Sequence, residues 1–203
     1  NCICDDEACR EASKQEIIRR YFDALNALAK GSTSEKEAQK IELLMNMAGI
    51  TVTDRKVVIK ALERAKETDG PAAALELRDG RIITGKTTNL LGASAALLLN
   101  VLKVLAGIDH ETHIISPESI EPIQKLKVDY LKSKNPRLHT DEVLIALSAS
   151  AATNPQARLA LSQLPELAGC QAHTSVMLSD VDIKIFKKLE VQLTSEAVYE
   201  HAL

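Results

Sequence analysis

Residues 72–84 read AAALELRDGRIIT, and this stretch decides the fold class of the chain. Two short apolar runs flank Asp79 and Gly80, and a D-G pair supplies the positive φ that a tight hairpin turn requires. We therefore expect two antiparallel strands that are joined at Gly80. The Ala- and Leu-rich segment that follows, residues 89–106, is typical of a buried helix, and Gly107 ends it.

Extended segments and helices continue to alternate after this unit. Strand segments that alternate with helices predict an α/β domain, here a three-layer α/β/α arrangement around a mixed sheet. The expected extended segments are residues 113–116, 172–178 and 191–194, and the expected helices begin at Pro117, Thr140, Pro155 and Asp180.

The first third of the chain has a different pattern, with three amphipathic helices. Two S-x-x-E capping boxes, which begin at Ser13 and Ser34, precede apolar residues at helical spacing, and a third helical pattern starts near Asp54. The segment ETDGP then marks a boundary. We predict a helical subdomain over residues 1–70 and an α/β subdomain over residues 71–203.

Charge and hydropathy argue against two classes of partner. The net charge is −3 and aromatic residues make up 2% of the chain, whereas surfaces that bind nucleic acid are usually basic and carry aromatic rings for stacking. The longest apolar run, residues 90–108, contains Asn100 and Lys103 and lacks flanking anchors. We therefore expect neither a nucleic-acid partner nor a membrane partner.

The four cysteines are Cys2, Cys4, Cys9 and Cys170. Structural zinc sites favour paired cysteines or histidines, and no second pair follows the first three cysteines. No signal segment opens the chain, and reduced thiols agree with a cytoplasmic location. We expect no metal site and no cofactor.

Residues 80–87, GRIITGKT, match the phosphate-loop pattern G-x-x-x-x-G-K-[ST]. A phosphate loop needs a helix that opens at its Lys-Thr pair, so that backbone N–H groups converge on the phosphates. Here RIIT reads as a strand, which would place Gly80 about 13 Å from Gly85. ATP-dependent activity through this motif is therefore the weakest of our hypotheses, and a strand-to-helix junction at Lys86 remains.

Residues 79–107, from the D-G turn through TGKTTN to the following helix, resemble the opening of cytidine-deaminase-like domains. The resemblance implies a cytidine-deaminase-like topology. The zinc chemistry of that family requires [His/Cys]-Ala-Glu at the helix start and a later Pro-Cys-x-x-Cys. This chain has Ala93, Ser94 and Ala95 at the helix start and a lone Cys170, so the resemblance is to the fold without its zinc ligands.

Six stretches in one order extend over essentially the whole chain: DDEACREASKQEIIRRYF, RIITGKT, LLGASAALLLN, SPESIEPIQKLK, NPRLHTDEVLIALSASAATNP and KKLEVQLT. They resemble the C-terminal part of the bacterial domain-of-unknown-function family DUF1846. Members of that family are considerably longer and have no established activity. The resemblance therefore implies a fragment, which starts at Asn1, and an absent N-terminal domain as a partner.

Three polar loops lie at junctions between expected elements. Ligands of α/β domains usually bind where such loops meet at one edge of the sheet. The first loop, TGKTTN, offers Lys86, Thr87 and Asn89 before a helix N-terminus, where an anion would meet backbone N–H groups and a lysine. The alternative is that the threonine and asparagine side chains only cap the helix.

The other two loops contain histidines. In NPRLHTDE, a histidine beside carboxylates is typical of acid–base chemistry, so we predict His139 and Asp141 as catalytic residues and Arg137 as a ligand-binding residue. The alternative is that the acids only suit the helix dipole. The third loop, CQAHTS, contributes His173 as a further ligand-binding residue. Cys170 points to the opposite face of an extended strand, which argues against a metal pair.

Two functions are compatible with these patterns, and the sequence leaves open whether the protein is an enzyme. The first is a small-molecule-binding α/β domain of a cytoplasmic putative enzyme that holds an anionic or nucleotide-like ligand. The second is a structural and oligomerisation module whose chemistry lies in the absent N-terminal part. The Ala/Leu-rich helix and the three amphipathic helices favour the second, and we expect a homo-oligomer.

Overall fold

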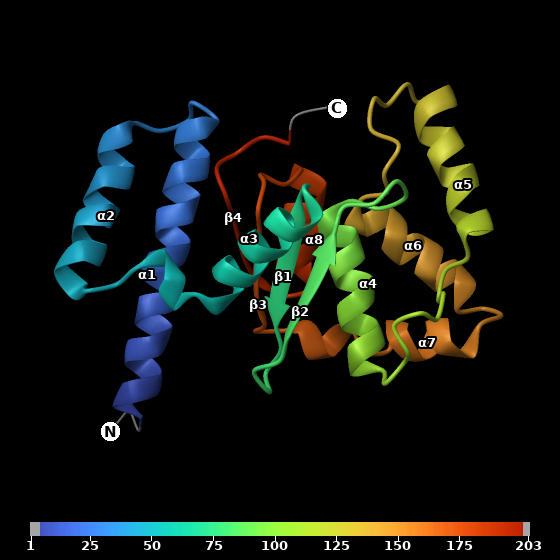
Figure 1. The fold of residues 1–203 in the computed structure, drawn as a ribbon, viewed down its shortest axis with the longest axis horizontal. Helices are drawn as coiled ribbons and strands as arrows, with labels where there is room; N and C mark the ends of the chain where they lie inside the picture. The colour runs from blue at the N-terminus through green and yellow to red at the C-terminus, as the bar shows by residue number, and fades with distance from the viewer. Residues whose placement is uncertain (1–4, 201–203) are drawn as a thin grey trace.

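A computed structural model describes residues 5–200 of the chain (Figure 1). Eight α-helices and four strands make up the regular structure of these residues, together with three short helical segments. The α-helices are α1 (Asp6–Ala29), α2 (Glu35–Ala48), α3 (Lys56–Thr68), α4 (Ala93–Leu105), α5 (Pro117–Lys125), α6 (Thr140–Ser150), α7 (Pro155–Leu161) and α8 (Asp180–Lys188). The strands are β1 (Ala72–Glu76), β2 (Ile82–Lys86), β3 (Gln171–Thr174) and β4 (Gln192–Ser195). The short segments are η1 (Val52–Asp54), the π-helical η2 (Leu126–Tyr130) and η3 (Leu164–Leu167).

The four strands form one mixed sheet in the order β2-β1-β3-β4. Strand β1 is antiparallel to both β2 and β3, and β3 is parallel to β4. The predicted hairpin is confirmed, because Leu77 N donates to Arg81 O over 2.9 Å and Gly80 has a φ of 84°. The α/β class and the mixed sheet are therefore as predicted, and the finer cytidine-deaminase-like topology stays a prediction.

Helices cover both faces of the sheet, so successive residues of β1 are buried in different layers. Ala73 packs in the large core together with Leu97 of α4. Ala74 points to the other face and packs against Val57 and Ala61 of α3. All five side chains are fully buried, and the sheet lies between α3 and α4 (Figure 1).

Strand β2 touches α4 at a glycine. A Cβ atom at Gly85 would lie only 2.2 Å from the backbone nitrogen of Leu97, so no side chain fits between strand and helix. This close approach holds the edge strand β2 against α4, the buried Ala/Leu-rich helix that the sequence predicts.

Helices α1 and α2 form a pair on one side of the sheet (Figure 1). Ile18 and Phe22 of α1 pack with Met45 of α2 in a small apolar cluster. The predicted start of α1 at Ser13 is wrong, because α1 begins at Asp6 and the Asp5 side chain accepts the N–H of Ala8 over 2.9 Å. An acidic first turn beside that cap extends the helix by two turns at its N-terminus.

Two other expectations from the sequence need correction. Residues 113–116 form no strand, because their apolar side chains Ile114 and Ile115 are buried in the core and no neighbouring strand pairs with them. The helix expected from residue 89 begins at Ala93. The Thr88 hydroxyl instead accepts N–H groups from Leu90 and Leu91, which makes a turn.

Arg55 connects the N-terminal helices to the sheet. Its side chain is fully buried and donates to Thr194 Oγ1 over 3.0 Å, to Gln15 Oε1 over 3.2 Å and to the carbonyl of Ala172 over 3.1 Å. Gln171 Oε1 and the Gln192 carbonyl also accept from it. The predicted division at residue 70 stays a prediction, and α3, on its N-terminal side, packs against the sheet.

None of the helices within residues 5–200 combines the length and the hydropathy that a membrane-spanning segment needs.

Candidate functional site

The three polar loops lie near one another at the end of the sheet where β2, β3 and β4 finish. Leu138 N donates to Leu90 O over 2.9 Å, and Gly92 N donates to Leu138 O over 3.2 Å, so a short parallel bridge joins the first two loops. From the third, the Ser175 hydroxyl accepts the N–H of Ala72 over 3.0 Å. The first two loops are therefore in direct contact, whereas the cited bond of the third loop is to the start of β1.

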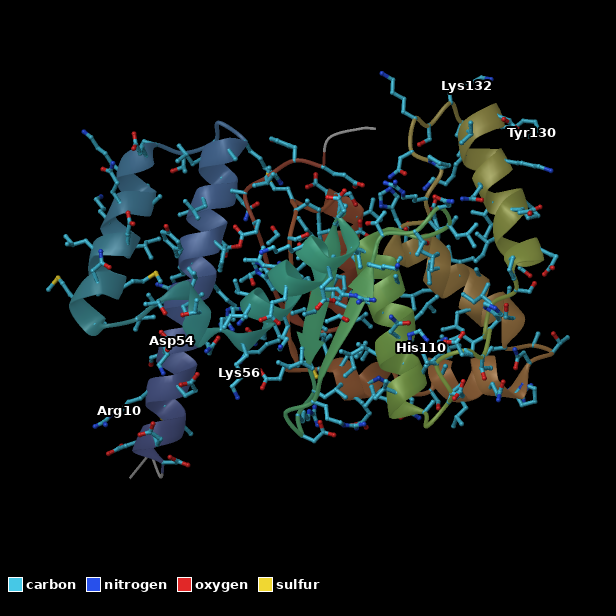
Figure 2. All side chains as sticks on the ribbon, in the orientation of Figure 1. Arg10, Asp54, Lys56, His110, Tyr130 and Lys132 are labelled. Atoms are coloured by element: carbon cyan, nitrogen blue, oxygen red, sulfur yellow. The ribbon has the colours of Figure 1, made fainter. Side chains whose placement is uncertain are left out.

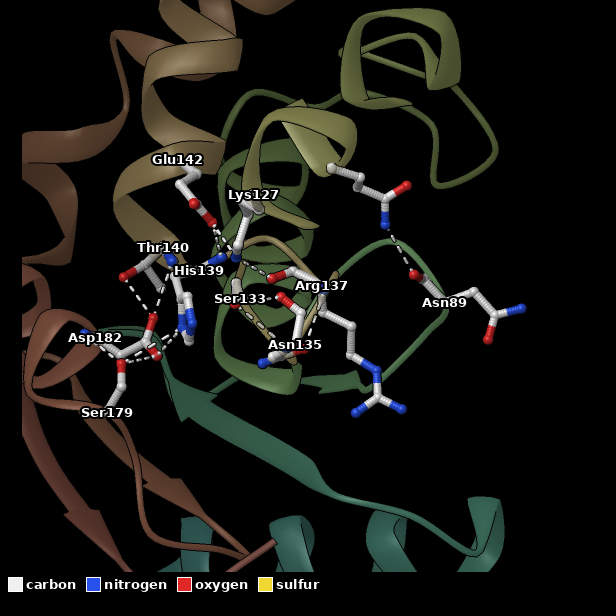
Figure 3. A network of polar contacts seen from close by, with 11 residues as sticks. Asn89, Lys127, Ser133, Asn135, Arg137, His139, Thr140, Glu142, Ser179 and Asp182 are labelled. Atoms are coloured by element: carbon white, nitrogen blue, oxygen red, sulfur yellow. Dashed lines mark hydrogen bonds and ion pairs between the residues drawn. The ribbon is translucent and has the colours of Figure 1, made fainter. Parts of the chain in front are cut away.

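A buried carboxylate, Asp182 near the start of α8, organises the second loop and the start of α8 (Figure 3). Its Oδ1 accepts from the backbone N–H of Thr140 over 2.9 Å and from the Thr140 hydroxyl over 2.8 Å. Its Oδ2 accepts from the Ser179 hydroxyl over 2.7 Å and lies 3.0 Å from Nδ1 of His139. Asp182 thereby fixes the N-terminus of α6 to that of α8.

Hydrogen bonding has a larger effect than burial on the pKa of Asp182. Burial alone would raise the pKa of Asp182, but hydrogen bonds from His139, Thr140 and Ser179 lower it to about 2. The hydrogen bond to Asp182 raises the pKa of His139. With its Nδ1–H assigned to the carboxylate, His139 presents Nε2 as a proton acceptor, and about one third of its side chain is exposed.

A second carboxylate, Glu142, supports the backbone beside this pair. Its Oε2 accepts the N–H of His139 over 2.8 Å and the Nζ of Lys127 over 2.8 Å. Lys127 also donates to the carbonyl of Arg137 over 2.6 Å. The Arg137 guanidinium extends away from the His139 ring and pairs with Glu200 over 2.6 Å (Figure 3).

Sequence reasoning paired His139 with Asp141, and the structure pairs it with Asp182 instead. Within residues 5–200 the Oδ1 of Asp141 is buried without a hydrogen-bond partner. Asp182 was missed, although Ser179 and Asp182 form an S-x-x-D pattern that marks a helix start. That pattern predicts the cap, but not that the carboxylate turns to a histidine 43 residues away.

A large, mostly apolar-walled hollow lies on the other side of the first loop, at the free edge of β2. This cavity, of about 720 Å³, is called the edge cavity below. It reaches from Arg64 of α3 past Thr84 and Lys86 of β2 to Lys103 of α4, and His110 lies beside α4 (Figure 2). Its charged and imidazole lining groups are Arg64, Lys86, Lys103, His110 and His113, and no Asp or Glu lines it.

This one-sided lining distinguishes the edge cavity from four other hollows of the described chain. The hollow between α1 and β4 contains Asp23 and Glu190 among its lining groups. The hollow at the base of α1 contains Glu11, Asp54 and Glu76. The remaining two also combine acids with bases. A lining that includes basic residues and no acidic residue is therefore particular to the edge cavity among these five, while Glu67 and Glu111, outside the lining, lie beside Arg64 and His110.

The predicted site residues do not share one place. Lys86 and Asn89 line the edge cavity, His139 belongs to the Asp182 network, and the Arg137 guanidinium pairs with Glu200. Thr87 does not line the cavity either, and its N–H donates to the carbonyl of the residue before β1 over 2.9 Å. A single site that joins Lys86 with His139 is not what the structure contains.

His173 lies inside the protein, on the sheet face that α1 and α3 cover. It is fully buried, its Nδ1 lies 2.8 Å from Thr194 Oγ1, and its ring centroid is 4.9 Å from that of Phe22. Burial lowers its pKa. Glu196 lies 3.2 Å from Nε2, outside good hydrogen-bond geometry. The ring is therefore a packing element without access for a ligand.

Neither the phosphate-loop pattern nor the cysteines form a site in the part of the chain described. Strand β2 contains IITGK, and α4 opens seven residues after Lys86, so no loop wraps a phosphate there. Cys9 is exposed and Cys170 is buried, and both are free thiols. Cys2 and Cys4 lie outside the described residues. Within residues 5–200 no group of three or more His, Cys, Asp or Glu side chains is placed to hold a metal ion.

These features define an α/β protein with a four-stranded mixed sheet, a histidine held by a buried carboxylate and a cavity of positive lining. Residues 53–203 match the family described as "Domain of unknown function DUF1846, C-terminal", and residues 1–49 match "Domain of unknown function DUF1846, N-terminal". The chain belongs to the DUF1846 family. The expected resemblance to the C-terminal part alone is therefore corrected, because both family descriptions match.

Curated relatives carry the name UPF0371 protein. The chain is 59% identical to that of Corynebacterium aurimucosum over 198 residues, which cover 98% of this chain and 40% of the relative. It is 53% identical over 200 residues to that of Corynebacterium diphtheriae and 48% identical over 199 residues to that of Streptococcus thermophilus, with the same two coverages. The chain thus spans 40% of the length of these relatives.

Proposed function

We propose that this chain binds a small anionic ligand in the edge cavity, beside Lys86. The observation that supports the proposal is the lining itself, which has three cationic side chains and two histidines and no carboxylate. Clefts lined by one sign of charge concentrate ligands of the opposite sign. Cavities of about 300–1,000 Å³ with apolar walls and few polar groups are the usual shape of small-molecule sites.

Lys86 is the cation that such a ligand would meet. The amino group of Lys103 is already held by the carbonyls of His110 and Thr112, the latter over 3.0 Å, and burial lowers its pKa. One terminal nitrogen of Arg64, Nη1, donates a hydrogen bond to Glu67 over 3.1 Å. The Nε of Arg64 has no hydrogen-bond partner within residues 5–200. Lys86 is exposed and forms no ion pair with any described residue.

A panel of anions with matched variants tests the proposal. Thermal unfolding of the wild-type chain would be recorded with inorganic phosphate, ATP, sugar phosphates and alkyl carboxylates. At least one anion should raise Tm, and Lys86→Gln should remove most of that rise. Lys184→Gln makes the same charge change on the exposed face of α8 and should leave the rise intact. If every anion acts equally on the two variants, the site is elsewhere.

Three further expectations from the sequence are part of this proposal. They are the cytoplasmic location, the cytidine-deaminase-like topology and a role as one domain of a putative enzyme. His139, oriented by Asp182, is the acid–base group that such an enzyme would offer.

A structural and oligomerisation module is the second candidate, because three large apolar side chains are exposed toward the C-terminal end of α2. Leu43, Leu44 and Met47 have exposed fractions of 61%, 49% and 79%. Tyr130, 77% exposed, stands at the outer end of the α5–η2 segment (Figure 2). Isolated apolar side chains are common on surfaces, and the presence of three on one helix face supports a contact surface there.

Light scattering after size-exclusion chromatography tests this second candidate. A dimer that the double variant Leu44→Lys with Met47→Lys converts to a monomer would support it. A chain that is monomeric at all concentrations would contradict it.

A further inference from the structure

The edge cavity follows the unpaired side of β2, and this side presents backbone donors. The pairs Leu77 with Arg81 and Thr87 with Pro71 are hydrogen-bonded rungs of the β1–β2 ladder. Bonded and non-bonded rungs alternate in antiparallel pairs, so the N–H groups of Thr84 and Lys86 point outward. No hydrogen-bond acceptor for either N–H lies within the described chain.

The free edge of β2 does not accommodate a further peptide strand. The Asn100 side-chain amide donates to the outward carbonyl of Thr84 over 2.9 Å, in the middle of the strand. A peptide that continued the ladder would need that carbonyl for its own N–H. Because Asn100 already occupies the Thr84 carbonyl, the ligand that fits this edge is a small molecule that accepts hydrogen bonds at one end.

The walls of the cavity are aliphatic. Leucine and isoleucine side chains make up its apolar surface, and no Phe, Tyr or Trp lines it. Nucleobases are usually held by stacking on large aromatic rings, and the cavity offers only the imidazoles of His110 and His113. Alkyl chains need only apolar contact area, which these walls supply. The aliphatic lining residues are Leu90, Leu91, Leu99, Ile114, Ile115 and Ile120.

From these observations we infer that the ligand of the edge cavity is an aliphatic anion, an alkyl chain with a carboxylate or phosphate at one end, and not a nucleotide. The anionic group lies between the Lys86 side chain, Arg64 and the outward N–H groups of Thr84 and Lys86. The alkyl chain lies along Leu99 and the buried 114–115 segment. This inference rests on the proposed function and narrows its ligand class.

Calorimetric titration of the chain with hexanoate, octanoate and decanoate, below their micelle concentrations, tests the inference. Each added methylene group should raise affinity roughly fourfold, because one buried CH₂ contributes about 0.8 kcal/mol. Lys86→Gln should weaken all three by a similar factor of about ten and keep the chain-length slope. Lys184→Gln should change neither the affinities nor the chain-length slope. Decyl phosphate in a parallel titration distinguishes a phosphate head group from a carboxylate.

Inorganic phosphate and AMP complete the design. Tighter binding of AMP than of decanoate or decyl phosphate, or binding of phosphate with no dependence on chain length, would overturn the aliphatic class and leave the anion site standing. Binding that tightens with chain length but has the same affinity in Lys86→Gln as in the wild type would also overturn it, since the alkyl chain would then bind at another surface. Failure of every anion to bind would overturn both the inference and the proposed function.

Discussion

At the scale of single residues, Asp182 shows how a buried charge is made stable. Its side chain is 4% exposed, and removal from water by itself disfavours the ionised form. Four donors from His139, Thr140 and Ser179 surround the two oxygens and favour that form more strongly. The carboxylate therefore stays charged, and its stabilisation depends on pH.

The Asp182→Asn variant tests whether the stabilisation by this carboxylate is lost at low pH. The pKa of Asp182 falls from 3.8 to about 2 on folding, so its contribution is present above pH 3.8 and is lost as pH falls toward 2. The corresponding free energy is about 2 kcal/mol. Urea unfolding between about pH 6 and pH 3 should show the stability advantage of the wild type over Asp182→Asn shrinking as pH falls. Asp180→Asn, on the exposed side of the same first turn, should follow the wild-type curve.

His139 should produce the opposite pH dependence. The bond to Asp182 raises its pKa in the folded protein, so its contribution is fully present below the unfolded pKa of about 6.5 and is lost as pH rises through the folded pKa. The difference in unfolding free energy between wild type and His139→Gln should therefore decrease from about pH 6 to pH 9. A constant difference over this range would contradict the charged pair.

At the scale of secondary-structure elements, the contact between β2 and α4 depends on one glycine. A Cβ atom at Gly85 would meet the backbone nitrogen of Leu97 at 2.2 Å and its Cα at 2.5 Å. Backbone atoms of a packed helix do not move aside as a flexible side chain does, so β2 and α4 would separate. Residues of both elements line the edge cavity, and the cavity would change with them.

Gly85→Ala should therefore lower the free energy of unfolding by about 3 kcal/mol. Chemical denaturation measures this directly, and the same variant should lose the anion-induced rise in Tm. Gly70→Ala is the matched control, because a Cβ there meets only an ordinary contact at 3.8 Å and should leave stability within about 0.5 kcal/mol of wild type. Equal stability of Gly85→Ala and Gly70→Ala would contradict the prediction, because it would mean that α4 moves away from the new Cβ atom without loss of stability.

At the scale of the whole molecule, Arg55 holds the N-terminal helices to the far half of the sheet. It bonds to Gln15 of α1, to Gln171 and Ala172 of β3, and to β4. All its described partners are neutral oxygens, and burial lowers its pKa to about 10, so it stays charged at neutral pH. A buried cation satisfied in this way is costly to lose, because its acceptors remain buried.

Arg55→Met should lower the free energy of unfolding by about 3 kcal/mol or more. It should also increase hydrogen exchange in α1 and β4 together, since both lose the same partner. Arg10→Met removes an exposed arginine from α1 and should change stability by less than about 0.5 kcal/mol. Loss of protection in only one of the two elements would show that other contacts connect them.

Local sequence determined the elements of this protein. The D-G pair places the hairpin turn, glycines end helices such as α2 at Gly49, and the apolar run within residues 90–108 becomes the buried α4. These features depend on the backbone freedom and periodicity of neighbouring residues. The start of α1 and the supposed strand at residues 113–116 were predicted wrongly, because an alternative cap and burial in the core decide them.

The candidate sites depend on contacts between distant segments, which only the tertiary structure decides. Asp182 meets His139 because α6 and α8 begin at the same sheet edge, and no spacing in the sequence encodes that meeting. His173 lies on a strand as expected, yet the helices that cover its face exclude it from ligands. Lys86 lines the same cavity as Arg64 and Lys103 because α3, β2 and α4, which are separate in sequence, come together there.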